Sequence, residues 1–144
     1  MPTVDFYLID VATLNEQLRF ACRLLDKAYL QQYTAYVHVE NRAVAETMYD
    51  LLWTFRDISF VPHDLMNGPN SADAPVIIGS DEKPLQQHDI LLNLHTSVPE
   101  FYSAYNRVVE IVHQDAAWQK IARKHYKFYQ NQGHEVKTHD LRKP

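Results

Sequence analysis

Residues 4–39 open with Val4-Asp-Phe-Tyr-Leu-Ile9 and close with Thr34-Ala-Tyr-Val-His-Val39. Both runs are rich in aromatic, aliphatic and β-branched residues, a composition typical of buried strands. Between them apolar residues recur at helical spacing from about Thr13 to Gln32, and the Thr13 side chain can cap the start of this helix. A strand, a helix and a second strand in this order predict parallel strands joined by a right-handed crossover.

The same alternation continues to the C-terminus. Asn41 can cap a helix that runs to about Leu52, and Asp115 can cap a last helix over about Ala116 to Gln132. Shorter segments predict strands at Pro75–Gly79, Ile90–Leu94, Arg107–Val112 and, at an edge, Glu135–His139, with a short helix beginning at Pro99. We therefore expect one three-layer α/β domain over residues 1–144, with a mostly parallel central sheet flanked by helices in a Rossmann-like order.

Length and composition fit a cytoplasmic protein. A chain of 144 residues suits one domain, and a composition of 46% hydrophobic and 22% charged residues is ordinary for a soluble globular fold. No apolar run approaches the length of a membrane span, and no signal-peptide pattern precedes Val4. Cys22 is the only cysteine and lies on the apolar side of the first helix, so we expect a buried thiol and no internal disulfide.

The sequence lacks the familiar catalytic and cofactor-binding patterns. With three glycines in the chain, no glycine-rich phosphate cradle can form, and no nucleotide-binding loop follows the first strand. His38-Val-Glu40 resembles the His-x-Glu of zinc deaminases, but a single cysteine cannot supply their paired thiolates. We expect no catalytic residue, no metal and no cofactor. The enzyme alternative is a small hydrolase or phosphotransfer protein that uses Asp10 at the end of the first strand, with Glu40 at another strand end.

Residues 51–65 concentrate large apolar side chains at a spacing that suits neither a helix nor a regular strand. These side chains are Trp53, Phe55, Ile58, Phe60 and Val61. Pro62 cannot donate a ladder hydrogen bond, so we do not expect this segment inside a sheet. The segment either packs on the protein's own core or forms an exposed docking surface for another protein, and both alternatives stay open.

The last helix separates its charges from its apolar groups. Its outer side carries four cations at spacings i, i+3, i+4 and i+7: Lys120, Arg123, Lys124 and Lys127. No acidic residue lies between Ala116 and Gln132, so this helix is locally positive although the chain has a net charge of −4. The cationic side is a solvated helix surface, a site for an acidic peptide, or a weak platform for the phosphates of nucleic acid.

Four blocks of sequence occur in a specific order along the chain. They are Val4-Asp-Phe-Tyr-Leu-Ile9, Tyr36-Val-His-Val-Glu40, Leu52-Trp-Thr-Phe55 with Ser59-Phe-Val-Pro-His63, and Ala122-Arg-Lys-His-Tyr-Lys-Phe-Tyr129. In these blocks, over nearly its whole length, the chain resembles the chi subunit family of bacterial DNA polymerase III. The resemblance implies a non-catalytic adaptor of the clamp-loader assembly in the bacterial cytoplasm. It also implies a heterodimer with the psi subunit, a contact with the acidic C-terminal tail of single-stranded DNA-binding protein, mainly indirect contact with DNA, and no membrane association.

The resemblance also implies binding roles for two sets of residues in this sequence. The psi contact falls on the aromatic segment, at Trp53, Phe55, Phe60, Val61, Pro62 and His63. For the tail, Arg123 and Lys127 match the family's binding cations, with Lys120 and Lys124 beside them and an apolar notch near Val112 and Trp118. Gln119 departs from the pattern, because some relatives carry a basic residue at that position.

Overall fold

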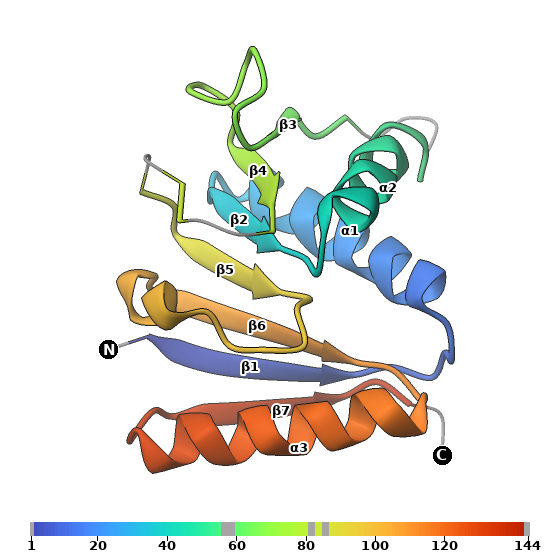
Figure 1. Cartoon of the computed structure of the whole chain (residues 1–144), viewed down its shortest axis with the longest axis vertical. Coiled ribbons are helices and arrows are strands. Elements are labelled where there is room, and N and C mark those ends of the chain that lie inside the picture. The colour runs from blue at the N-terminus through green and yellow to red at the C-terminus, as the bar shows by residue number, and fades with distance from the viewer. Residues whose placement is uncertain (1, 56–59, 81–82, 85–86, 143–144) are drawn as a thin grey trace.

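Seven strands form one twisted sheet in a computed structural model, which describes residues 2–55, 60–80, 83–84 and 87–142 (Figure 1). The strands are β1 (Thr3–Leu8), β2 (Ala35–His38), β3 (His63–Leu65), β4 (Val76–Gly79), β5 (Ile90–Asn93), β6 (Arg107–Val112) and β7 (Val136–Asp140). Their order in the sheet is β3-β4-β2-β5-β6-β1-β7, and each of these neighbouring pairs is parallel. The α/β fold with a parallel central sheet is confirmed.

Helices cover both faces of the sheet, which gives the predicted three layers. The helices are α1 (Leu14–Leu30), α2 (Arg42–Thr54), α3 (Ala116–Asn131) and the short 3-10 helix η1 (Glu100–Ala104). One core cluster joins α1 and α2 to one face of the sheet, through side chains such as Leu18, Met48 and Val37. The second joins α3 and η1 to the other face, through Tyr129, Tyr102 and Phe6. The buried thiol of Cys22, as predicted, belongs to the first cluster, and burial raises its pKa to about 12.

The three long helices begin at the predicted caps. The side chain of Thr13 accepts a hydrogen bond from the Glu16 N–H at 3.2 Å, and that of Asn41 accepts from the Val44 N–H at 3.0 Å. Asp115 does the same for the Trp118 N–H at 3.0 Å. Each cap satisfies a backbone donor that a helix leaves free at its first turn, so local sequence fixes where these helices start.

The aromatic segment differs from expectation, because part of it joins the sheet. α2 continues to Thr54, and β3 then adds residues 63–65 as an edge strand beside β4. Pro62 immediately precedes this strand, so its missing N–H lies outside the ladder and does not prevent pairing. Ile58 and Ser59 lie outside the described residues. In the part of the chain that the structure describes, no helix has the length and apolar character needed to cross a bilayer.

Candidate functional site

A groove of about 320 Å³ lies between α3 and the carboxyl ends of β1, β6 and β7. Its lining is Phe6, Leu8, Val112, Gln114, Gln119, Ala122, Arg123, Tyr126, Thr138 and Arg142. We call it the α3 groove. Aliphatic and aromatic groups form much of its lining. The guanidinium of Arg142 is already paired with Asp140 at 2.7 Å, so Arg123 supplies the positive charge that the groove can offer. Such a groove can hold an apolar side chain while Arg123 pairs with a neighbouring carboxylate.

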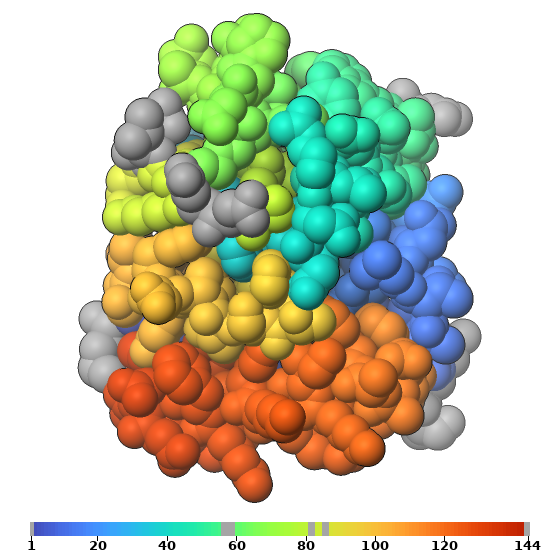
Figure 2. Space-filling model, in the orientation of Figure 1, coloured from blue at the N-terminus to red at the C-terminus, as the bar shows by residue number. Residues whose placement is uncertain are grey.

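Helical periodicity explains why the α3 groove lies where it does. Ala122 and Tyr126 are one turn apart, and both face the sheet, where the small alanine leaves space over Val112. The Tyr126 ring packs edge-on against Phe6, with ring centroids 5.2 Å apart. Figure 2 shows α3, in orange to red, along the lower part of the molecule, with its outer side open to solvent.

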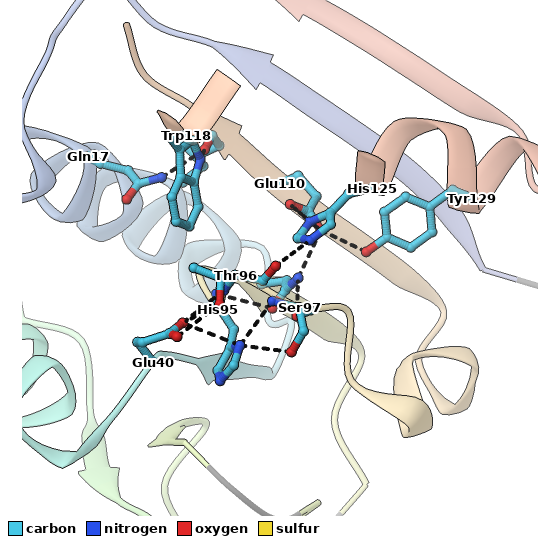
Figure 3. Close-up of polar contacts among 11 residues, drawn as sticks. Gln17, Glu40, His95, Thr96, Ser97, Glu110, Trp118, His125 and Tyr129 are labelled. Carbon is cyan, nitrogen blue, oxygen red and sulfur yellow. Dashed lines mark hydrogen bonds and ion pairs between the residues drawn. The ribbon is translucent and has the colours of Figure 1, made fainter. Parts of the chain in front are cut away.

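A buried polar network fixes α3 on β6 (Figure 3). The carboxylate of Glu110, a residue only 2% exposed, accepts hydrogen bonds from Tyr129 Oη at 2.7 Å, Asn93 Nδ2 at 2.9 Å and His125 Nδ1 at 3.0 Å. His125 Nε2 lies 2.9 Å from the carbonyl oxygen of Thr96. The partners of the two ring nitrogens are a carboxyl oxygen and a carbonyl oxygen, an arrangement that favours the doubly protonated imidazole, in which both nitrogens donate.

The electrostatics of this network follow from burial and pairing. Burial by itself lowers the pKa of His125, but the hydrogen bond and charge of Glu110 outweigh it, and the pKa is raised. Burial, with the nearby Glu110 charge, raises the pKa of Tyr129, which therefore stays a neutral donor. The network holds α3 in one position relative to β6, and β6 forms part of the floor of the α3 groove.

The residues predicted for the tail contact divide between the groove and its surroundings. Arg123 and Val112 line the α3 groove, and Gln119 lines it as well. The side chains of Lys120, Lys124 and Lys127 are exposed on the outer side of α3. Within the described residues, none of the four cations of this helix forms an ion pair. The cationic strip is therefore available to an external anion.

Trp118 does not line the groove, contrary to the notch predicted there. Its indole Nε1 donates to the carbonyl oxygen of Ile111 at 3.0 Å, and its ring stacks on His113 with centroids 5.6 Å apart. Tyr126 and Arg142 take part instead. Tyr126 follows Ala122 by one helical turn, so its place in the groove has a local signal, whereas nothing in the local sequence places Arg142, because its position depends on β7 pairing with β1.

A second exposed surface lies at the opposite edge of the sheet, where α2 meets β3. Trp53 is 47% exposed and Phe60 is 56% exposed, and their ring centroids are 5.2 Å apart. We call this pair the aromatic surface. His63 lies beneath it with its centroid 4.9 Å from that of Trp53. The His63 ring nitrogens lie 2.6 Å and 2.9 Å from the carbonyl oxygens of Val61 and Tyr49, which ties the end of α2 to β3.

The other residues predicted for this contact support the rings from within. Val61 is completely buried in the core cluster of α1 and α2, so it backs the surface without reaching a partner. His63 is also buried, while Phe55 and Pro62 are half-buried at its margin. Two exposed rings over a fixed base are typical of a protein contact site, where aromatic side chains supply much of the binding energy.

The residues of the enzyme alternative lack a catalytic arrangement. Asp10 is exposed, and the described residues contain no group of three His, Cys, Asp or Glu side chains that could hold a metal ion. Glu40 accepts hydrogen bonds from the N–H and the hydroxyl of Thr96, which with nearby His95 outweigh partial burial and lower its pKa. Ser97 Oγ and Glu40 both approach Nδ1 of His95, at 3.0 Å and 3.4 Å (Figure 3). A serine–histidine–acid relay needs both ring nitrogens, so this cluster is not one.

Known proteins of one family match this chain over nearly its whole length. The family model described as "DNA polymerase III chi subunit, HolC" matches residues 1–137. A Pseudomonas aeruginosa protein named DNA polymerase III subunit chi is 37% identical over 141 residues, which cover 98% of both chains. Proteins of the same name from Escherichia coli and Haemophilus influenzae are 29% and 27% identical, over 96% of this chain and 97% of theirs.

Proposed function

The chain belongs to the DNA polymerase III chi subunit family, and from this premise we propose that it is a non-catalytic adaptor with two protein-binding surfaces. In this proposal the aromatic surface joins the psi subunit of the clamp loader in a heterodimer. The α3 groove binds the acidic C-terminal tail of single-stranded DNA-binding protein. The observation that carries the proposal is the combination, in one groove, of an apolar lining with Arg123, which forms no ion pair with any residue that the structure describes.

The tail contact follows from the chemistry of the α3 groove. The terminal apolar side chain of the tail enters between Val112, Ala122 and Tyr126, where it is buried away from water. Arg123 pairs with its carboxylate, and the exposed lysines of α3 attract the remaining acidic residues. Exposed ion pairs contribute only about 0.5–1 kcal/mol each, so we expect a modest affinity that salt weakens. Several tails in one assembly then increase retention through effective concentration.

The psi contact is of a different kind. Trp53 and Phe60 present a large apolar area. Their rings are already held by contact with each other and with His63, so little side-chain conformational entropy is lost when a partner binds. Burial of aromatic rings at the centre of an interface produces affinity that depends weakly on salt. We expect a longer-lived complex here than at the α3 groove.

Direct binding of single-stranded DNA to α3 is the alternative function, since its cations also suit phosphates. The acidic tail is favoured because the apolar lining beside Arg123 matches a side chain that a phosphate backbone does not offer. In the proposed function, DNA is reached mainly through the single-stranded DNA-binding protein.

Calorimetric titration with a synthetic acidic tail peptide tests the proposal. We expect Arg123→Ala to weaken peptide binding by about tenfold, or about 1.4 kcal/mol, because Arg123 can pair with the carboxylate through two hydrogen bonds, a stronger contact than a simple exposed ion pair, whereas Arg142 in the same groove is already paired with Asp140. Arg42→Ala, which removes an exposed arginine from α2, is the matched control and should leave the affinity unchanged. Co-elution with psi should be the same for both variants. Equal peptide affinity of wild type and Arg123→Ala would refute the tail assignment.

A further inference from the structure

A second groove lies on the opposite face of the sheet from the α3 groove, along α1. Figure 1 places α1 level with β2 and β5, while β1 and β7 lie farther down beside α3. This leaves a groove of about 430 Å³ between α1 and the β1–β7 edge. Tyr7 lines this groove, whereas its neighbours Phe6 and Leu8 line the α3 groove, as expected for alternation along a strand. We call it the α1 groove.

The lining of the α1 groove is mostly apolar. Phe20, Leu24 and Ala28 follow one another at i, i+4 and i+8 along α1, and Leu92 and Val109 form the floor. The row on α1 spans about 12 Å at 1.5 Å per residue, which is a little over two helical turns.

Exposed apolar side chains stand at both ends of the groove. Leu141 is 52% exposed on the β7 side, and Tyr33 is 47% exposed beyond the end of α1. A shallower depression that shares Tyr33 adds Leu30, which is 73% exposed. The apolar surface thus extends beyond both ends of the groove, which favours a protein segment over a small molecule as its ligand.

The exposed side of α1 that borders this groove is cationic. Arg19, Arg23 and Lys27 are exposed at i, i+4 and i+8, and Lys27 itself lines the groove. Among the residues that the structure describes, none of the three forms an ion pair. Across the groove Arg107 is already paired with Asp5 at 2.7 Å. The unpaired charge therefore lies along α1.

We propose that the α1 groove is a docking site for an acidic amphipathic helix of a partner protein. A helix with apolar residues one turn apart matches the apolar row of α1, and Asp or Glu on its flank pairs with the three cations. This site is distinct from both surfaces assigned above.

Charge and shape favour this occupant over two others. A second copy docked by two-fold symmetry on the same surface would bring a second set of the same three cations, Arg19, Arg23 and Lys27, into the interface and no acidic strip to pair with them. Single-stranded nucleic acid needs exposed aromatic faces on which bases stack, whereas Leu92 and Val109 make the floor aliphatic. Of the aromatic residues in the lining, Tyr7 is already stacked on His139 with centroids 4.6 Å apart and lies 6.0 Å from the Phe20 ring, which leaves Tyr33 as the exposed ring.

The test is an NMR titration of the full chain carrying Arg123→Glu, which closes the α3 groove to acidic peptides. Two synthetic 15-residue helical peptides share the same leucine positions, and one has Glu and the other Lys on its flanks. We expect the Glu peptide alone to cause saturable amide shifts at residues 20–31, 90–92 and 139–141. Charge reversal of α1 (Arg19→Glu, Arg23→Glu and Lys27→Glu) should weaken this binding at least tenfold.

A matched control changes the same number of charges on α3 (Lys120→Glu, Lys124→Glu and Lys127→Glu) and should leave the shifts at the α1 groove in place. All six positions are exposed, so both variants should fold. The proposal is overturned if the Lys peptide binds equally well or if the Glu peptide shifts no amide along α1. Displacement of the peptide from these amides by a 15-nucleotide oligothymidylate, or a dimer in sedimentation that the α1 reversal dissociates, would also overturn it.

Discussion

At the β7 end of the sheet the exposed groups are cations over a buried polar network, whereas at the β3 end they are aromatic rings over an apolar core. The exposed groups at the two ends are therefore held in place by different interactions. α3 is located by hydrogen bonds that converge on Glu110, which are directional and fix one position of the helix. Trp53 and Phe60 are held by contacts with each other and by the contact of Trp53 with His63, which depend on packing. A single small domain can thus present one contact controlled by charge and another controlled by apolar area.

Glu110→Ala should have the largest effect, a loss of unfolding free energy from the polar network at the β7 end of the sheet. The substitution leaves the His125 charge buried without its partner and removes an acceptor from Tyr129 and Asn93. Breaking a buried ion pair in this way costs about 3–5 kcal/mol of unfolding free energy. Urea unfolding measures the loss, and Glu135→Ala, on an exposed carboxylate, should change stability by less than about 0.5 kcal/mol. A loss below 1 kcal/mol for Glu110→Ala would mean that the network does not anchor α3.

Phe60→Ala tests the β3 side. Removing this ring from the aromatic surface should cost the psi complex about 2 kcal/mol or more, roughly a 30-fold loss in affinity. Surface plasmon resonance with immobilised psi measures it. Tyr33→Ala removes a ring of similar exposure elsewhere on the molecule and is the control. Equal affinities of the two variants for psi would show that psi does not bind at Phe60.

Salt sharpens the contrast between the two surfaces. Raising the salt concentration from about 50 to 300 mM shortens the screening length, so binding of the tail peptide should weaken by roughly fivefold. The psi complex should change by less than about twofold, because its contact is mainly apolar. Titrations at both salt concentrations measure the two effects, and similar salt dependence at both surfaces would contradict their assignment to different chemistry.

Proton linkage gives the smallest expected effect. Because the pKa of His125 is raised in the folded state, the folded protein holds this proton at pH values where the unfolded chain has lost it. The stability from His125 is complete below the unfolded pKa near 6.5 and declines as pH rises through the folded pKa. The difference in unfolding free energy between wild type and His125→Gln should therefore shrink from pH 6 upward. A difference that grows with pH would show the opposite linkage.

The sequence predicted the elements whose signals are local. The caps at Thr13, Asn41 and Asp115 and the strands that follow α1 and α3 are encoded by side chains within a few residues. β3 was missed because it has only three residues, too few for a pattern, and follows a proline that usually argues against a sheet.

The candidate sites were predictable only in part, because they depend on strand order. Arg123 and Val112 could be assigned to one groove from helical spacing and the family resemblance. Arg142 reaches the same groove because β7 lies beside β1, which no local pattern encodes. Trp118 has the right spacing for the groove but lies in the first turn of α3, where its indole reaches the backbone of Ile111 at the end of β6. The α1 groove exists because α1 leaves β1 and β7 uncovered, a property of the assembled sheet.

Since the α3 groove lies over β6, β1 and β7, it stands about four to six strand spacings from β3 and the aromatic surface, or roughly 19–29 Å at 4.8 Å each. The two surfaces share no lining residue, so occupation of one leaves the side chains of the other exposed. If the proposed function holds, tension between the two partners would act across the sheet, so the network that fixes α3 on β6 would also resist displacement of the α3 groove.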